Sequence, residues 1–278
     1  MTHHASLRKS RAMMVTAMVT FGTLALFVRK ISVSSGELAL YRAVMATLML
    51  GAYFLISGQR IDFRAIRKEL PLLLISGMAM GINWILLFEA YRYTTVSVAT
   101  LSYYFAPVIV TLACPILFKE KMGVKQWICF AMSTLGIVLI TGIGDLSGGD
   151  THFIGILFGF GAAVLYASVI LLNKFIKGVA GIQRTFLQFV AAVVILLPYV
   201  LCTGGFHLTT MDGIGWVNLL MVGIVHTGIT YCLYFSSLKE IPGQEAAILS
   251  YIDPLIAVAV SVFLLGEQMT VQQLIGGG

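Results

Sequence analysis

A few ionisable residues interrupt the long apolar stretches of this sequence, and each of them could do chemistry there. A charge at the centre of a membrane helix costs at least about 2.5–3.5 kcal/mol, so such a residue is a candidate for function by default. Asp253 stands directly before Pro254, and a proline frees a backbone carbonyl one turn earlier. Such a break is tolerated where it faces protein or a water-filled cavity. We therefore expect Asp253 to bind a substrate amine or a coupling proton, the alternative being a cap that repairs the break.

His226 falls in the middle of another apolar stretch. A neutral imidazole there can hydrogen-bond a substrate or exchange a proton near neutral pH. The same stretch carries Thr227, Thr230, Tyr231 and Tyr234, a strongly polar side for a membrane helix. We expect His226 and Tyr231 to line a substrate site. The alternative for His226, equally open, is a core histidine satisfied by its neighbours.

Two further positions place charge within or near apolar stretches. Arg42 follows Glu37 by five residues. Glu89 precedes Arg92 by three residues, so Glu89 and Arg92 lie on one helix face. The functional interpretation of Arg42 and Glu89 is coupling or gating. The structural alternatives are that Arg42 reaches nearby carbonyls or Glu37, and that Glu89 simply pairs with Arg92.

A second proline, Pro107, occupies a similar setting, but Ala106 precedes it in place of an acid. The expected site is therefore asymmetric, with charge in one half of the chain and aromatic rings in the other. Its hydrogen-bonding and aromatic wall is expected to comprise Asn83, Trp84, Tyr103 and Tyr104. Ordinary packing is the alternative for the rings. We expect Pro107 and Pro254 to mark the breaks around which the helices rock during gating.

The elements that must position these residues are apolar helices. Of 278 residues 59% are apolar and 11% charged, against about 25% charged in a soluble domain, so most of the surface must face lipid. A helix that crosses a bilayer needs about 20 mostly apolar residues. Such runs cover about 12–31, 35–57, 70–91, 96–118, 124–143, 154–174, 182–202, 214–236 and 245–265. A tenth run begins at Val271, and we expect the sequence to end inside it, as a truncation or a fragment.

Basic residues predict the orientation. With a cytoplasmic N-terminus, fourteen Lys and Arg fall on the cytoplasmic side and three on the outer side. This is a strong positive-inside signal. We expect a multi-pass protein of the cell (inner) membrane with both termini of the full-length protein in the cytoplasm.

The sequence also contains an internal repeat. Shifted by 147 residues, segment 97–131 aligns without a gap on 244–278, with ten identities in 35 positions. Tyr104 meets Tyr251 and Pro107 meets Pro254, matches that apolar composition does not explain. Each half, 1–147 and 148–278, would hold five spans, and an odd number inverts the second half. The prediction is an all-α integral membrane fold of two inverted five-helix repeats, a plan typical of alternating access.

Several motifs resemble one known family. The first half carries Tyr91-Arg92-Tyr93-Thr94-Thr95-Val96-Ser97-Val98-Ala99, then Phe105-Ala106-Pro107-Val108-Ile109 and Phe118-Lys119-Glu120-Lys121. The second half carries Ile241-Pro242-Gly243-Gln244-Glu245-Ala246-Ala247, then Asp253-Pro254-Leu255 and Leu265-Gly266-Glu267. Over its whole length the chain resembles ten-helix EamA-type exporters of the drug/metabolite transporter superfamily. The resemblance implies a central cavity lined mainly by helices 1, 3, 4, 6, 8 and 9, and small-metabolite substrates such as amino acids.

The leading hypothesis is thus a secondary transporter, an exporter of a small metabolite, with protons as a possible coupling ion. No Gly-x-x-x-x-Gly-Lys phosphate loop is present, which argues against ATP drive within the chain. The four cysteines form no Cys-x-x-Cys pair, so we expect free thiols and neither metal nor other cofactor. A membrane-embedded enzyme, a receptor and a passive facilitator or channel are the alternatives. The scattered acids, without an Asp-x-x-Asp or His-x-x-x-His pattern, disfavour the enzyme.

Overall fold

The computed structural model describes residues 2–64, 66–119, 123–140, 149–179, 181–238 and 240–266. Its regular elements are helices, and no strand occurs among these residues. Glu120, Glu267 and the expected tenth helix lie outside the described residues. The α-helices are α1 (Thr2–Gly22), α2 (Leu24–Val28), α3 (Ser35–Ser57), α4 (Leu70–Tyr93), α5 (Val96–Tyr103), α6 (Phe105–Phe118), α7 (Val124–Ile140), α8 (Gly149–Phe175), α9 (Gly181–Thr203), α10 (Gly213–Leu220), α11 (Thr230–Leu238), α12 (Gly243–Ser250) and α13 (Ile252–Phe263). A short 3-10 turn, η2 (Leu208–Thr210), precedes α10, and a π-helix, η3 (Met221–Ile229), joins α10 to α11.

Seven stretches of the described residues are long and apolar enough to cross a membrane. They are Leu7–Val28, Ser35–Ser57, Leu70–Tyr93, Val98–Phe118, His152–Phe175, Gly181–Thr203 and Gly213–Leu238. Two of the nine expected spans are absent from this set. Of the run at 124–143, the described residues 124–140 form α7, a helix of 17 residues, and the rest lie outside the described residues; the run at 245–265 is divided into α12 and α13.

The runs that contain Pro107 and Pro254 each break three residues before that proline. Tyr104 separates α5 from α6, and Tyr251 separates α12 from α13. A helix that restarts just after the break places Pro107 or Pro254 in its first turn, where a backbone N–H has no partner in the same helix and proline costs little. The sequence predicted the breaks, and the structure puts each one slightly earlier along the chain.

Local signals fix several helix ends. Ser34 and Glu37 form a capping box at the start of α3, each side chain accepting from the other residue's backbone N–H at 3.2 Å. Gly58 ends the same helix in the left-handed conformation, with φ +65°. Asp212 caps α10 by accepting from Gly215 N at 2.8 Å.

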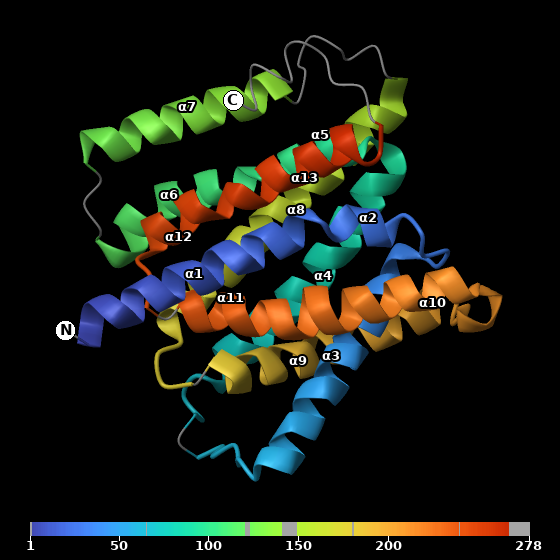
Figure 1. Cartoon of the computed structure of the whole chain (residues 1–278), viewed down its shortest axis with the longest axis horizontal. Helices are drawn as coiled ribbons and strands as arrows, with labels where there is room; N and C mark the ends of the chain where they lie inside the picture. Colours follow the sequence, from blue (N-terminus) through green and yellow to red (C-terminus); the bar gives the residue numbers. More distant parts are fainter. Residues whose placement is uncertain are drawn as a thin grey trace.

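The helices pack mainly between the two halves of the chain. The N-terminal helix α1 runs between α11 and α13 and contacts both (Figure 1). In the interior α4 packs against α8 and α9, and α3 packs against α9 and η3. The peripheral helix α7 lies beside α6 at one side of the bundle (Figure 1).

Small residues allow the closest of these contacts. A Cβ added at Gly77 would lie 2.7 Å from Ala191 Cβ and 2.8 Å from Gln188 Cα on α9. Gly81 is next along this face, and Gly155 and Gly159 meet Thr94 and Ser102 in the same way. These two Gly-x-x-x-Gly patterns therefore mark helix contacts, as such patterns do in membrane proteins.

The helix boundaries also repeat. Val96 and Gly243, which begin α5 and α12, are 147 residues apart, as are Tyr103 and Ser250, which end them. The starts of α6 and α13 have the same spacing.

Candidate functional site

A cavity lies among helices of both halves, with about 550 Å³ of empty space, part of it open to the surroundings. Its lining residues are Phe21, Gly22, Leu24, Ala25, Arg42, Trp84, Leu87, Tyr91, Thr100, Tyr103, Tyr104, Tyr166, Tyr231, Asp253 and Ala257. They come from α1, α2, α3, α4, α5, α8, α11, α13 and the α5–α6 break. The wall is mostly apolar and aromatic, with a few polar groups, as is usual for small-molecule sites.

Arg42 brings a positive charge to this cavity. Its side chain is 1% exposed, and its Nε donates to Thr227 Oγ1 at 2.8 Å. The guanidinium carbon lies 4.3 Å from the centroid of the Trp84 ring and 5.4 Å from that of Phe88, which is cation–π geometry. Nη1 has no hydrogen-bond partner among the described residues. The guanidinium is therefore held by Thr227 and by the two rings, while its buried Nη1 has no partner in the described part of the chain.

Aromatic rings from several helices form much of the cavity wall. Trp84 Nε1 donates to the Tyr231 hydroxyl at 2.9 Å, and the ring of Phe21 meets Tyr231 edge-on at 4.9 Å. Tyr103 stacks on Tyr166 with centroids 5.0 Å apart. These contacts fix the rings, because aromatic pairs prefer such offset or edge-to-face arrangements.

The two helix breaks border the same space. Tyr104, at the first break, is 2% exposed, and its hydroxyl has no partner within the described part of the chain. Asp253 lies two residues after the break at Tyr251, in the first turn of α13, and forms no ion pair with any described residue. The cavity thus contains one guanidinium, one carboxyl group and one free phenol.

Six of the residues expected at the site share this cavity: Arg42, Trp84, Tyr103, Tyr104, Tyr231 and Asp253. Asn83, Glu89, His226, Pro107 and Pro254 are not among its lining residues. Each of the first three has a different partner, described next.

Asn83 and Glu89 make contacts of other kinds. Asn83 is buried, and its Nδ2 donates to the carbonyl of Ala162 at 2.6 Å, which ties α4 to α8. Glu89 pairs with Arg92 at 3.2 Å on the exposed side of α4, the contact that the pairing alternative expects.

His226 lies in the π-helix η3. Its Nε2 is 3.0 Å from Thr23 Oγ1, and its Nδ1 is 3.2 Å from the carbonyl of Met221. The ring of Phe27 packs on it at 4.8 Å. The wider π turn also lets Thr227 Oγ1 bond the carbonyl five residues earlier, at Val222, while Thr227 accepts from Arg42. Single π turns within helices are frequent at functional sites.

The structure adds Tyr91, Thr100 and Phe21 to the site. Tyr91 and Thr100 approach within 3.4 Å through their hydroxyls, one at the end of α4 and one in α5. In the sequence, Tyr91 and Thr100 lie near a helix end, where polar and aromatic residues are usual at the membrane interface. Only the fold of α5 back over α4 brings them to the cavity.

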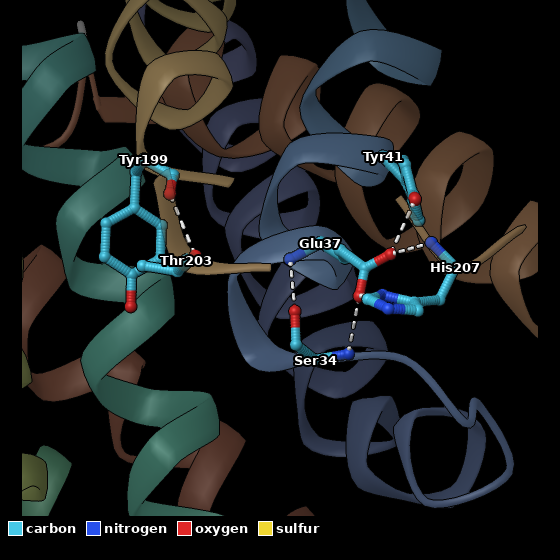
Figure 2. Close-up of polar contacts among 6 residues, drawn as sticks. All are labelled: Ser34, Glu37, Tyr41, Tyr199, Thr203 and His207. Carbon is cyan, nitrogen blue, oxygen red and sulfur yellow. Dashed lines mark hydrogen bonds and ion pairs between the residues drawn. The ribbon is translucent and has the colours of Figure 1, made fainter. Parts of the chain in front are cut away.

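A second polar cluster lies outside the cavity, where α3 begins (Figure 2). Glu37 is 1% exposed and accepts from the Tyr41 hydroxyl at 2.9 Å and from Ser34 N at 3.2 Å. Its Oε2 lies 3.1 Å from His207 Nδ1, and its Oε1 accepts from the His207 backbone N–H. Glu37 therefore joins the start of α3 to the loop after α9, and it has no contact with Arg42.

Other polar contacts outside the cavity join the two halves or fix the turn between α8 and α9. Arg11 and Glu245 form an ion pair, with Nη2 and Oε2 3.0 Å apart. The carboxylate of Glu69 accepts from the backbone of Lys177 and Gly178 at 2.9–3.1 Å. Arg184 is 1% exposed and donates to the carbonyls of Asn173, Ile176 and Val179, which end α8 and its loop.

Within the part of the chain that the structure describes, no three His, Cys, Asp or Glu residues come together as a metal site. The polar groups of the cavity suit reversible binding of a small molecule.

Comparisons with known proteins agree with this arrangement. The chain is 32% identical over 275 residues to the uncharacterized transporter YxxF of Bacillus subtilis, covering 98% of this chain and 88% of that one. It is 29% identical over 273 residues to an uncharacterized transporter of Archaeoglobus fulgidus, covering 98% and 93%. A protein of known crystal structure shares the fold with a TM-score of 0.75, at 17% identity and over 96% of this chain and 92% of that chain.

The names of these relatives indicate a transporter rather than an enzyme. A family profile matches the chain twice, at residues 9–142 and 153–278, and so covers nearly all of it. With several membrane-spanning helices packed around a buried cavity, the chain belongs to the EamA-like transporter family.

Proposed function

We propose that the protein is a secondary transporter that exports a small metabolite, an amino acid or similar, across the cell (inner) membrane by alternating access. The observation that carries the proposal is the cavity between the two halves, which holds Arg42 and Asp253 among aromatic rings. A membrane protein that keeps ionisable groups inside its bundle has them facing a substrate or ion pathway as a rule.

Three observations support two inverted repeats, residues 1–147 and 148–278. The family profile matches once in each half, and the bounds of α5 and α6 recur 147 residues later in α12 and α13. Packing recurs as well. A shift of 147 residues places α3 on α9, and α4 on the stretch that contains η3. In the structure α4 contacts α9, and η3 contacts α3. Five spans per half would place the second half upside down in the membrane.

The cavity would reach from the midplane toward the outer face. In an inverted repeat the axis that relates the halves lies in the membrane plane. Trp84 and Tyr231 are equivalent positions in contact, and such a pair can meet only near that axis. Arg42 and Tyr91 lie further toward the end of the bundle where α1 ends and α3 begins, which the positive-inside signal assigns to the outside.

Gating would exchange contacts between the halves at the two faces. Arg11–Glu245 and the Glu69 contacts would close the cytoplasmic side, and Glu37–His207 the outer side. Bending at the breaks before Pro107 and Pro254 would let α5–α6 and α12–α13 move, since each helix is already interrupted there.

Asp253 and His226 are the candidate proton carriers. Asp253 faces the cavity directly, whereas His226 contacts Thr23, which lies between the lining residues Gly22 and Leu24. Protonation of either group would change the charge at the cavity without a bound metal or other cofactor.

The test is flux in liposomes that contain the purified protein. Radiolabelled amino acids, nucleobases, amines and sugars are loaded inside, and efflux is measured against protein-free liposomes. Saturable efflux of one class supports the proposal. Flux that rises linearly with concentration for unrelated solutes would favour a passive channel, and chemical turnover without a gradient would favour an enzyme.

A further inference from the structure

The strongest unexplained feature of the cavity is a pair of buried hydrogen-bond donors without partners. Arg42 Nη1 and the Tyr104 hydroxyl both lack a partner among the described residues, and both side chains are at least 98% buried. Leaving a buried donor unpaired costs about 1–3 kcal/mol, and more when it is charged. Two such groups lining one cavity indicate a ligand that accepts hydrogen bonds there.

The other contacts of Arg42 do not involve Nη1. Thr227 occupies Nε, while Trp84 and Phe88 cover the guanidinium plane. Rings over the plane cannot accept from the in-plane N–H groups. The edge of the guanidinium is therefore presented for a planar acceptor, and a carboxylate is the group that guanidinium edges match best.

The second charge of the cavity restricts the ligand further. Asp253 lines the same space and has no ion-pair partner in the described ranges. A dianion such as a phosphate monoester would add two negative charges beside that carboxyl group. A zwitterion instead complements both charges, and a matched pair of charges lowers the cost of burying each one.

We propose that Arg42 Nη1 and the Tyr104 hydroxyl form a carboxylate-binding subsite, and that the transported solute is a small zwitterion whose ammonium group faces Asp253. This inference rests on the proposed transport function and names its substrate class and recognition residues. Tyr104 stands at the break before Pro107, so ligand bound there contacts the very point where the first helix pair is interrupted.

The experiment uses two matched sets of probes on the detergent-purified protein. One set is leucine, leucinamide, 4-methylpentanoate and 3-methylbutan-1-amine, and the other is phenylalanine with its three equivalents. All members of a set have the same side chain. The amide lacks the carboxylate charge, the deaminated acid lacks the ammonium group, and the amine lacks the whole carboxylate. Binding is read as a rise in melting temperature and by competition for uptake of the same radiolabelled amino acid into proteoliposomes.

The expected result is that at least one of the two amino acids binds, and that its amide and its amine bind at least 10-fold more weakly. Tyr104→Phe removes one hydroxyl from the wall and is expected to weaken amino acid binding roughly 10-fold. Arg42→Lys keeps the charge but loses the planar edge and is expected to weaken it at least as much. Tyr199→Phe, a hydroxyl removed outside the cavity, is the control and should bind like the wild type.

Equal binding of the amino acid and its amide would overturn the carboxylate subsite without relying on any variant. Equal binding of the deaminated acid would overturn the zwitterion. If a folded Tyr104→Phe variant binds the amino acid as tightly as the wild type does, Tyr104 is not part of the subsite. If only solutes of other classes bind and move, this inference fails while the transport function stands; if no solute moves at all, both fail.

Discussion

Trp84 and Tyr231, 147 residues apart, are hydrogen-bonded to each other at 2.9 Å, indole Nε1 to phenol oxygen. The same spacing separates the equivalent ends of α5 and α12. The bond therefore joins two corresponding positions of the halves and closes the cavity wall at its centre. Since both side chains are buried, the indole N–H has no access to an alternative partner in bulk water.

Tyr231→Phe should destabilise the protein by about 1–3 kcal/mol, because it leaves the buried Trp84 donor unpaired. Thermal unfolding in detergent measures the loss. Tyr53→Phe is the control, since Tyr53 is exposed and its hydroxyl accepts only a 3.4 Å bond from Gln59. A melting temperature for Tyr231→Phe equal to that of the control would show that the bond contributes nothing to stability.

Gly77→Ala should lower stability by about 1–3 kcal/mol, because the added methyl group meets the backbone of α9. Gly81→Ala is the matched variant one turn later. There the nearest atoms lie at 3.2–3.4 Å, and small shifts can accommodate the methyl group at a cost below about 1 kcal/mol. Chemical or thermal unfolding of both variants in the same detergent compares them. The reverse order of stabilities would contradict the contact between α4 and α9.

Glu37→Gln should destabilise the start of α3 and release the loop after α9. The amide nitrogen donates and cannot accept, so it conflicts with the donors Ser34 N and His207 that now surround the carboxylate. We expect a loss of about 1–3 kcal/mol and faster proteolysis between residues 204 and 212. Glu89→Gln is the control, because its exposed pair with Arg92 contributes at most about 1 kcal/mol. Unchanged proteolysis in Glu37→Gln would contradict this role.

Asp253→Asn and His226→Gln separate the two candidate proton carriers. In proteoliposomes with an imposed pH gradient, the variant that lacks the carrier should still exchange solute across the membrane but should lose its response to the gradient. We expect the lost response in Asp253→Asn, with exchange slowed by weaker solute binding as well, because Asp253 lines the cavity and faces the ammonium group of the solute, whereas His226 does not line it. A wild type indifferent to the gradient would establish facilitated transport, and a response lost only in His226→Gln would assign coupling to the histidine.

The membrane orientation can be tested with single cysteines in a variant without native cysteines. Gln59→Cys, in the loop between α3 and α4, should react with an impermeant maleimide only after the membrane is opened. Phe206→Cys, between α9 and α10, should react in intact cells. Both positions are exposed in the structure. The opposite pattern would invert the predicted topology.

Much of the fold could be predicted because lipid leaves few choices. Apolar runs of about 20 residues predicted nine spans, seven of which are matched by candidate spans among the described residues, and Pro107 and Pro254 predicted two breaks. The run at 245–265 is the instructive difference. Its composition suits one long helix. The structure instead has two helices, because the chain breaks at Tyr251, three residues before Pro254.

The site was predicted in part because a sequence reveals polarity but not the neighbour that a helix face meets. Asp253, Trp84 and Tyr231, expected from their types and settings, line the cavity. Asn83 was expected to line the cavity. Its side of α4 faces α8 instead, where the Ala162 carbonyl accepts a hydrogen bond from the Asn83 amide. The position of Arg42 depends on Thr227, 185 residues away, a contact that no local pattern encodes.

The packing of α3 and α4 has a consequence for biosynthesis. Their main partners, α8, α9 and η3, are translated after them. At about 5–20 residues per second, α3 and α4 must wait on the order of ten seconds for those partners to emerge. During that interval the buried Arg42 has neither Thr227 nor a closed cavity around it, so the nascent first half needs lipid headgroups, water or the insertion machinery to shelter its charge.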